Sequence, residues 1–396
     1  MRVALLTREY PPEIYGGAGV HVEYLARELR RLIEVDVHCF GEPRKEKGVT
    51  AHVADAHLLE AGANAALLTM STDLSMAAAT AGVDLVHSHT WYANFAGHTA
   101  KLLGEVPHVV TTHSLEPLRP WKAEQLGGGY ALSSFCERTA IEAADAVIAV
   151  SAGMADDVLR CYPAVDPGRV RIIHNGIDTD EYRPTSDRSV FAEHDIDLDR
   201  PIVIFVGRIT RQKGLPYLLT AAHAFDDAAQ LVVLASAADT PEIADEVEAG
   251  IRGLQEIRDG VHWIRRMVPK AELIQLFSAA TVFVCPSIYE PMGIVNLEAM
   301  ACETAVVATH TGGIPEVVAD GDTGILVPID HDPADPYGAP RDPGAFAGAF
   351  AEAVNALVGD PARAAAMGVA GRKRAVESFS WTAIAERTRD LYASLR

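Results

Sequence analysis

The chain has 396 residues, which at roughly 150 residues per domain predicts two or three domains with sizeable cores. Hydrophobic residues make up 49% and charged residues 22%, a composition typical of a folded protein and not of a disordered one. Lysine and arginine number 34 against 54 acidic residues. The resulting formal charge of −20 disfavours binding to nucleic acid or to an anionic membrane surface.

The five cysteines form no Cys-x-x-Cys pair, which argues against a disulfide framework and a structural zinc site. No apolar run approaches the ~18 residues of a membrane span. The segment Met1 to Thr7 is too short for a signal peptide and runs into Arg8 and Glu9. We therefore predict a soluble cytoplasmic protein with reduced thiols. The oligomeric state is left open, a homodimer included.

Short apolar runs alternate with amphipathic stretches along the first half of the chain. The expected strands are Val3–Leu6, Val35–Phe40, Asp84–His87, His108–Thr111, Ala146–Val150 and Val170–Ile173. The expected helices between them include His21–Leu32, Ser133–Ala144 and Ala152–Arg160. This alternation is typical of a parallel sheet wound by right-handed crossovers.

The same pattern restarts after a polar stretch, Thr179–Arg200, that is rich in Asp and contains Pro184. The second series of strands is Ile202–Val206, Leu231–Ala235, Val261–Trp263, Val282–Cys285, Ala305–Ala308 and Gly324–Val327. We predict an α/β fold of two doubly wound domains facing each other across a cleft. The predicted parts are an N-terminal domain (1–180), a linker (181–200), a C-terminal domain (201–378) and a C-terminal helical segment (379–396) packing back on the first domain.

Open parallel sheets bind ligands beyond the carboxyl ends of their strands, so motifs at strand ends carry most weight. The first strand leads into a Gly-rich turn that includes Gly16 and Gly17 and is followed by a helix. Glycines and a helix N-terminus let backbone amides approach an anion. A tight turn without a ligand is the alternative, and the spacing is not the G-x-G-x-x-G of a dinucleotide site.

Two cations follow the first strand of the second series, in the string Gly207-Arg208-Ile209-Thr210-Arg211-Gln212-Lys213-Gly214. A guanidinium from Arg208 and an ammonium from Lys213 at one strand end suit a diphosphate whose charge grows as it departs. The string is not a Walker loop, and a solvated basic turn is the alternative. We predict a phosphate site here.

Two glutamates eight residues apart, Glu290 and Glu298, follow the strand Val282–Cys285. The intervening Pro291 and Gly293 suit a helix entry whose free amides bind a phosphate or a sugar hydroxyl. Glu298, on the following helix, can accept hydrogen bonds from the two hydroxyls of a ribose. A surface salt bridge is the alternative for either glutamate alone.

Three histidines follow strands of the first series. We interpret His87 as a satisfied, partly buried histidine and His113 as a residue that bonds a substrate hydroxyl. His89 is a candidate acceptor-side residue, and the spacing does not predict a metal site. The basic residues that could hold a phosphorylated acceptor are Arg119, Lys122 and Arg138. The alternative is that these three are solvated surface cations.

Together these motifs resemble the retaining nucleotide-sugar glycosyltransferases of the GT-B fold, whose two domains are Rossmann-like. The resemblance spans essentially the whole chain. Within that group the chain is similar to the actinobacterial (Corynebacterium-type) glycogen synthase family, also known as the α-maltose-1-phosphate synthases. The strings that carry this likeness are Arg8-Glu9-Tyr10-Pro11-Pro12, His113 through Lys122, and His174-Asn175-Gly176-Ile177-Asp178.

The resemblance implies transfer of glucose from ADP-glucose, with retention, to glucose 1-phosphate or to the end of an α-1,4-glucan. It implies that Arg208 and Lys213 hold the diphosphate, Glu298 the ribose, and Glu290 with Met292, Gly293 and Ile294 the donor glucose. It places His113 beside the reacting sugar and Gly16-Gly17 over the donor phosphates, with no cofactor and no metal. Tyr15 stands where plant and enterobacterial synthases more often have Lys. Of the two acceptors, we favour glucose 1-phosphate for glycogen and α-glucan synthesis.

Other classes of function remain as alternatives. A metal-dependent glycosyltransferase of the other common fold would use a strand-end Asp-x-Asp, for which Asp178-Thr179-Asp180 and Asp195-Ile196-Asp197 are the available strings. A non-enzymatic sugar-nucleotide or glucan binder would release no ADP. A phosphosugar epimerase would consume the nucleotide-sugar without an acceptor.

Overall fold

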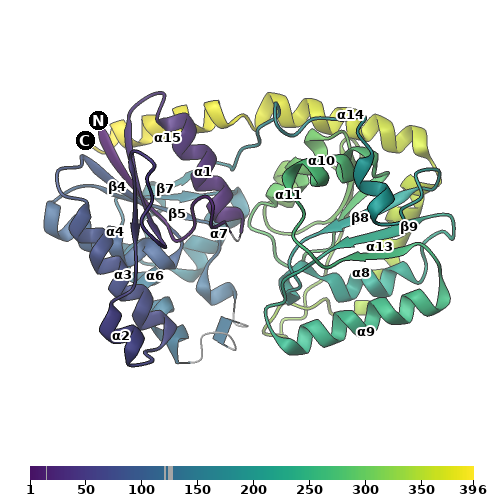
Figure 1. Cartoon of the computed structure of the whole chain (residues 1–396), viewed down its shortest axis with the longest axis horizontal. Coiled ribbons are helices and arrows are strands. Elements are labelled where there is room, and N and C mark those ends of the chain that lie inside the picture. The colour runs from purple at the N-terminus through teal and green to yellow at the C-terminus, as the bar shows by residue number, and fades with distance from the viewer. Residues whose placement is uncertain (15, 120–121, 124–127) are drawn as a thin grey trace. The chain divides into compact units, whose positions relative to one another are not determined.

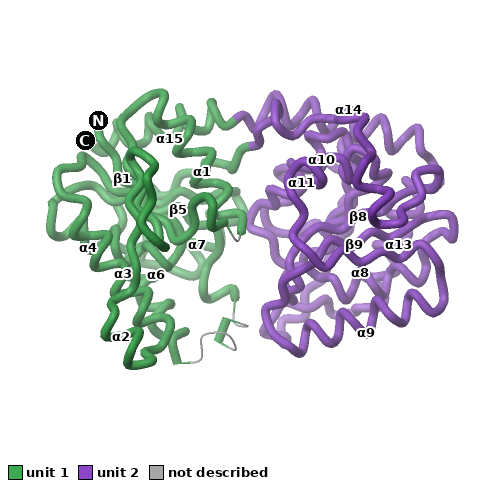
Figure 2. Tube along the Cα trace, in the orientation of Figure 1, with its two compact units in different colours: residues 1–176, 381–396 green, residues 177–380 purple. Residues whose placement is uncertain are grey.

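The computed structural model describes residues 1–14, 16–119, 122–123 and 128–396. Tyr15 and the Pro120-Trp121 part of the string that carries the resemblance lie outside the described residues. The chain divides into two compact units, which Figure 2 shows in different colours. Unit 1 comprises Met1–Gly176 and Trp381–Arg396, and unit 2 comprises Ile177–Ser380.

Unit 1 is built on a seven-stranded parallel sheet with the order β3-β2-β1-β4-β5-β6-β7. Its strands are β1 (Arg2–Leu6), β2 (Glu34–Phe40), β3 (Val49–His52), β4 (Leu85–His89), β5 (His108–Thr112), β6 (Ala146–Ala149) and β7 (Val170–Ile172). The short strand β3 was not among the predicted strands, because its Val-Thr-Ala-His sequence has no sustained apolar run.

Helices cover both faces of this sheet (Figure 1). They are α1 (Gly17–Leu29), α2 (Ala56–Glu60), α3 (Ala65–Ala79), α4 (Trp91–Gly104), α6 (Gly129–Ala143), α7 (Ala152–Cys161) and α15 (Trp381–Ser394), with 3₁₀ turns η1 (Glu116–Leu118) and η2 (Pro167–Arg169). Alternation along β1 assigns the faces: Val3 and Leu5 pack with α1 and α15, whereas Ala4 and Leu6 pack with α3 and α4. Two cores therefore lie on opposite sides of one sheet.

Helix α15 belongs to unit 1, although residues 177–380 separate it in sequence from the rest of that unit. The Trp381 ring stacks on Tyr24 of α1, with ring centroids 5.7 Å apart. The Tyr392 hydroxyl lies 2.6 Å from Nδ1 of the buried His87. The helix thus contributes both apolar surface and a buried hydrogen bond to the first sheet.

Unit 2 has a six-stranded parallel sheet with the order β10-β9-β8-β11-β12-β13. Its strands are β8 (Ile202–Val206), β9 (Gln230–Leu234), β10 (Val261–Ile264), β11 (Val282–Cys285), β12 (Ala305–Thr309) and β13 (Gly324–Val327). Its helices are α8 (Leu215–Ala222), α9 (Pro241–Ile257), α10 (Lys270–Ala279), α11 (Ile294–Ala301), α12 (Ile314–Val317), α13 (Pro343–Val358) and α14 (Pro361–Ser378), with 3₁₀ turns η3 (Ser189–Glu193) and η4 (Arg211–Lys213).

One face of the second sheet packs against α8, α9 and α13, and α10 and α11 lie on the other side (Figure 1). The Phe283 ring of β11 meets Phe277 of α10 edge-on, with centroids 5.5 Å apart. Residues 181–200, predicted as a linker, belong to unit 2. There Val190 and Phe191 are buried, and the Val190 amide donates to Gln275 of α10.

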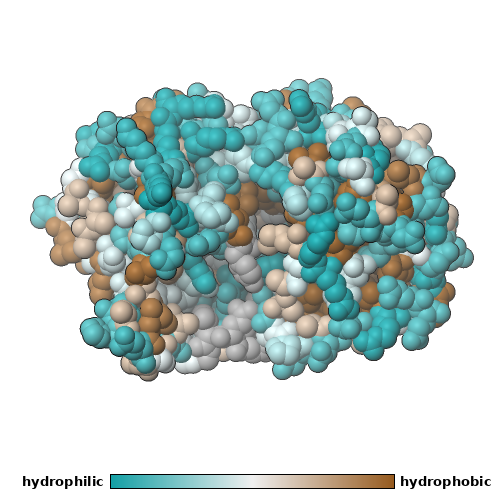
Figure 3. All heavy atoms as spheres, viewed as in Figure 1, coloured by the Kyte–Doolittle hydropathy of each residue, from teal (hydrophilic) through white to brown (hydrophobic). Residues whose placement is uncertain are grey.

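Hydrophobic residues on the face drawn in Figure 3 are interspersed with hydrophilic ones. Among the described residues, every helix is too short or too polar to serve as a bilayer span.

Replacing Tyr392 by Phe should lower the free energy of unfolding by about 1–3 kcal/mol, because the buried His87 Nδ1 would lose its partner. Urea denaturation measures the change. The control, Ser394→Ala, removes an exposed hydroxyl of the same helix and should stay within about 0.5 kcal/mol of wild type. Equal stability of Tyr392→Phe and the control would contradict the role given to this hydrogen bond.

Candidate active site

Arg208 follows β8 directly and is held by a carboxylate. Its Nη1 donates to Asp239 Oδ1 at 2.9 Å, and the Asp239 side chain is only 7% exposed. The backbone fixes this contact, because the Ile209 amide donates to Ala237 and the Asp239 amide donates to Ile209. Asp239 comes from the loop after β9, the neighbouring strand. A guanidinium is therefore presented at the carboxyl edge of the sheet in a fixed place.

Lys213 pairs with Glu290, as the Nζ atom donates to Oε2 at 2.6 Å. The Ser287 hydroxyl donates to the same oxygen at 3.1 Å. Burial lowers the pKa of Lys213, but the Glu290 carboxylate more than offsets this, so that the net pKa is raised. The ammonium is therefore charged at neutral pH.

Two glycines allow backbone segments to approach each other closely beside this ion pair. Gly214 has φ +65°, and a Cβ on it would lie 2.0 Å from the Pro286 carbonyl oxygen. Gly312 has φ +53°, and a Cβ there would lie 2.0 Å from the Glu290 carbonyl oxygen. Side chains larger than hydrogen are thus excluded on both sides of the Lys213–Glu290 pair.

The segment from Met292 to Glu298 combines a helix N-terminus with a second carboxylate. Met292 is buried, Gly293 caps α11 with φ +87°, and Ile294 is the first residue of that helix. Glu298 Oε1 accepts from the Tyr182 hydroxyl at 3.0 Å. Burial raises the pKa of Glu298, although the Tyr182 bond works against this. The structure therefore gathers Arg208, Lys213, Glu290 and the start of α11 at neighbouring strand ends of unit 2.

The Gly-rich turn of unit 1 already holds a carboxylate. Gly16 caps α1, and its amide donates to Glu9 Oε2 at 2.7 Å. Gly17 is exposed in the first turn of the helix. A negative group thus occupies the N-terminus of α1, where the helix dipole favours it.

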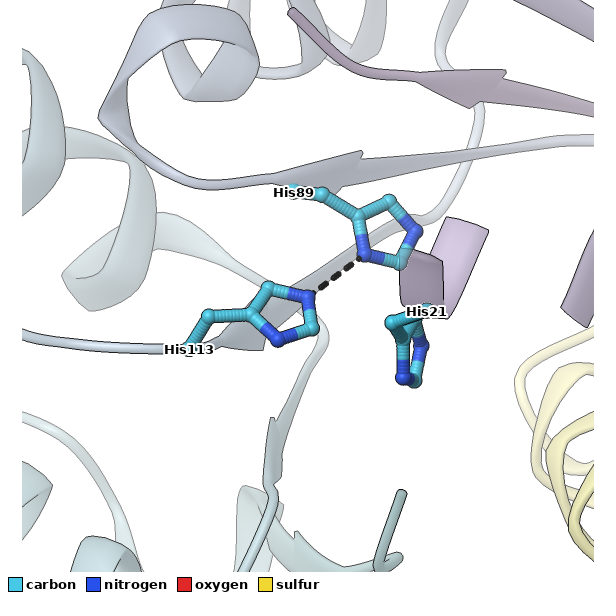
Figure 4. Close-up of side chains that lie close together, drawn as sticks. All are labelled: His21, His89 and His113. Carbon is cyan, nitrogen blue, oxygen red and sulfur yellow. Dashed lines mark hydrogen bonds between the residues drawn. The ribbon is translucent and has the colours of Figure 1, made fainter. Parts of the chain in front are cut away.

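Three histidines meet at the carboxyl edge of the first sheet (Figure 4). His89 Nδ1 and His113 Nε2 are 3.1 Å apart, and the His21 ring of α1 lies 4.7 Å from His113 by centroid. Burial lowers the pKa of all three, and the neighbouring imidazoles lower those of His89 and His113 further. The cluster is therefore neutral at physiological pH.

His87 is satisfied, as predicted, and it is fully buried. Its Nδ1 bonds Tyr392, and its Nε2 bonds the Thr111 hydroxyl at 2.7 Å. Both ring nitrogens are thus used, which distinguishes His87 from the neighbouring cluster.

The three candidate acceptor cations have different surroundings. Arg119 Nη1 donates to the Ser114 hydroxyl at 2.8 Å, beside His113 in sequence. Lys122 is buried, at 8% exposure, whereas Arg138 lies exposed on α6. The structure brings Arg119 to the His113 loop, and the Lys122 amide donates to the Arg119 carbonyl at 2.9 Å.

A buried pair of glutamates supports this loop. Glu137 of α6 accepts from the Glu116 amide at 2.7 Å and from the Tyr162 hydroxyl, while Ser133 donates to Glu116 Oε2 at 2.6 Å. Burial and then the Glu116 charge raise the pKa of Glu137 to about 8. The pair therefore carries a proton at neutral pH.

The Asp-x-Asp strings serve local turns. Asp178 Oδ1 accepts from the amides of Asp180 and Glu181, and Asp197 Oδ1 accepts from that of Asp199. Neither string belongs to a group of three potential metal ligands within the described residues, where one such group is found: His21, His89 and His113.

Four residues that contact the cation site of unit 2 or the histidine cluster of unit 1 were not predicted as site residues from the sequence: Asp239, Tyr182, His21 and Asn175. Each forms a hydrogen bond with a residue far away in the chain, such as the bond between His21 Nδ1 and Asn175 Oδ1 at 2.7 Å. The one available signal was position, since Asp239 follows the end of β9 as Arg208 follows β8.

Comparison with known proteins identifies the class. The family model for Glycosyltransferase Family 4 matches residues 15–181, and that for Glycosyl transferases group 1 matches residues 186–335. The solved structure of sucrose-phosphate synthase from Thermosynechococcus elongatus superposes with a TM-score of 0.78 and 26% identity, covering 100% of this chain and 98% of that one. Two parallel-sheet α/β units and both matches make the chain a glycosyltransferase of the GT-B fold.

Relatives of high sequence identity show to which family of GT-B glycosyltransferases the chain belongs. The α-maltose-1-phosphate synthase of Mycolicibacterium smegmatis is 59% identical over 395 residues, and that of Mycobacterium tuberculosis is 58% identical, with 99% of each chain covered in both cases. The chain belongs to the α-maltose-1-phosphate synthase family, which confirms the resemblance seen in its sequence motifs.

The raised pKa of Glu137 predicts a pH dependence of stability. Between about pH 4.5 and 8 the folded protein holds a proton on Glu137 that the unfolded chain has released, so the contribution of Glu137 to stability falls as pH rises. Glu137→Gln should remove this contribution, so its free energy of unfolding relative to wild type should rise across this range by about 1.4 kcal/mol or more, the equivalent of one pKa unit. Urea midpoints across this range provide the measurement. Glu142→Gln, on the same helix, should keep the wild-type slope, and an equal slope in Glu137→Gln would refute the assignment.

Proposed function

We propose that this protein transfers glucose from ADP-glucose to glucose 1-phosphate with retention of configuration, giving α-maltose 1-phosphate for α-glucan synthesis. The observation that carries the proposal is the pair of cations at the carboxyl edge of unit 2, each fixed by a buried carboxylate. The names of the family's relatives support the product.

Arg208 and Lys213 would bind the diphosphate of the donor. In a chain of charge −20, an anionic leaving group needs local cations, and these two are held in place before it binds. As the glycosidic bond breaks, negative charge grows on the leaving phosphate, and fixed cations stabilise that charge without reorganising. Arg and Lys would thus do what a metal ion does elsewhere, so that the transfer needs no metal.

The other donor contacts follow from the start of α11. Glu298 would accept hydrogen bonds from the ribose hydroxyls, exchanging its bond with Tyr182. Glu290 and the backbone from Met292 to Ile294 would bind the glucose. Gly16 and Gly17 would approach the donor phosphates, where the Gly16 amide now binds Glu9.

Retention sets a further requirement. A covalent intermediate would need a carboxylate nucleophile on the opposite face of the sugar. Glu290 is engaged by Lys213 and Ser287 and is assigned to hydroxyl binding. We therefore favour attack on the same face, with the leaving phosphate taking the acceptor proton and the His113 carbonyl facing the developing oxocarbenium ion.

The acceptor phosphate would be held by cations of unit 1. Arg119 lies on the His113 loop through its bond to Ser114, and Arg138 is exposed on α6. Lys122 and His89 complete the proposed acceptor residues. Elongation of an α-1,4-glucan, the alternative reaction, would need no phosphate site.

Arg208→Ala and Lys213→Ala should each lower kcat by about 10²–10³, with a smaller effect on donor affinity, because the charge they meet grows in the transition state. Steady-state ADP release with acceptor present measures both parameters. Arg211→Ala is the matched control, since Arg211 lies in the same turn and pairs with the surface residue Glu246. Near wild-type turnover in either of the first two variants would refute the phosphate role, and a total absence of ADP release from wild type would favour a binding protein.

Acceptor choice has a direct assay. Incubation with ADP-glucose and either glucose 1-phosphate or an α-glucan, followed by separation of the products, should give maltose 1-phosphate from the first. Arg138→Glu should raise KM for glucose 1-phosphate while leaving any glucan reaction unchanged. Arg160→Glu, an exposed arginine of α7, is the control. Product from glucan alone would establish the alternative reaction.

A further inference from the structure

His21, His89 and His113 bring their ring nitrogens together although they come from separate elements. His21 lies in α1, His89 ends β4, and His113 follows β5 (Figure 4). One ring nitrogen of each lies within 4.8 Å of the others. His21 and His89 are 2% and 0% exposed, whereas His113 is half-buried.

One ring nitrogen of His21 lacks a hydrogen-bond partner among the described residues: its Nε2 atom is buried and unpaired. His89 Nε2 is unpaired as well, but Nδ1 is the His89 nitrogen that faces His113. Asn175 Oδ1 accepts from His21 Nδ1 at 2.7 Å, so the hydrogen of the neutral ring is on Nδ1 and Nε2 carries a bare lone pair. A buried lone pair without a donor is costly, so the arrangement calls for a ligand.

The donor set indicates what kind of ligand fits. Three neutral imidazoles without a carboxylate favour a borderline transition-metal ion such as Zn²⁺ over Mg²⁺ or Ca²⁺. His89 Nδ1 and His113 Nε2 are 3.1 Å apart, close to the ~3.3 Å between two nitrogens of a tetrahedral zinc site with bonds of about 2.05 Å. The His21–Asn175 bond is the kind of outer contact that orients a histidine ligand.

We propose that His21, His89 and His113 bind one Zn²⁺-class ion, with water as the fourth ligand, and that this ion inhibits glucosyl transfer. With the ion bound, the His113 ring is a metal ligand and can no longer bond a hydroxyl of the sugar. The inhibitory half rests on the proposed function, whereas the binding half stands on the cluster alone. His87 is not a ligand, because Tyr392 and Thr111 occupy both of its ring nitrogens.

Binding is tested without reference to activity. Zinc chloride is titrated into the chelator-treated full-length protein against a chromophoric chelator, and one tight equivalent is expected. Co²⁺ in its place should give the visible absorption bands of a tetrahedral site. The absence of both the equivalent and the bands would overturn the proposal.

Variants locate the site. His21→Asn should abolish the tight equivalent, and Asn175→Ala should weaken it by about 10- to 100-fold, the usual effect of removing an outer contact. The matched control is His52→Asn, because His38 Nδ1 and His52 Nε2 form another close histidine pair in unit 1, 3.0 Å apart. Loss of zinc in the control with retention in His21→Asn would place the ion elsewhere and refute the assignment.

Rate measurements with and without zinc distinguish a failure of this inference from a failure of the proposed function. EDTA-treated enzyme should be fully active, added Zn²⁺ should inhibit it, and a chelator should restore the rate. His21→Asn should lose the inhibition, measured relative to its own rate without zinc. Zinc bound at the histidines without inhibition would overturn the inhibitory half alone. Loss of activity in EDTA would instead contradict the metal-free transfer of the proposed function.

Discussion

The ion pair between Lys213 and Glu290 is the contact on which the proposed donor site depends. It joins the turn after β8 to the loop after β11, two neighbouring strands of one parallel sheet. Parallel strands bring their carboxyl ends to one edge, so residues 77 apart in sequence meet there. Ser287 and the glycines at 214 and 312 surround the pair and hold its geometry. A cation fixed in this way needs no rearrangement when an anion develops beside it.

The two units share a parallel-sheet architecture but differ in the charge of the groups at the carboxyl ends of their strands. In unit 2 each cation faces a carboxylate in a partly buried turn, and the Glu290 carboxylate raises the pKa of Lys213. In unit 1 burial keeps the histidines neutral and leaves a proton on the Glu116–Glu137 pair. Unit 1 therefore presents neutral imidazoles around His113, which suit the hydroxyls of a sugar. The same neutrality leaves lone pairs that a metal ion can take.

The sequence predicted the fold class and the strands well, because buried parallel strands are continuous apolar runs. Arg208, Lys213 and Glu290 were predicted as site residues from their positions at strand ends. Their partner Asp239 was not, nor were Tyr182 and the His21–Asn175 bond, because these contacts depend on tertiary packing between distant segments. The edge strand β3 lacked an apolar run, and residues 181–200 looked like a linker because they are polar, although Val190 and Phe191 anchor them in unit 2.

The central claim is that Arg208 and Lys213 hold a nucleoside diphosphate. A crystal structure of the protein with ADP tests it most directly. We expect phosphate oxygens within hydrogen-bond distance of the guanidinium of Arg208 and the ammonium of Lys213, with the ribose at Glu298. A structure in which ADP binds elsewhere, while these two side chains contact only Asp239 and Glu290, would contradict the account.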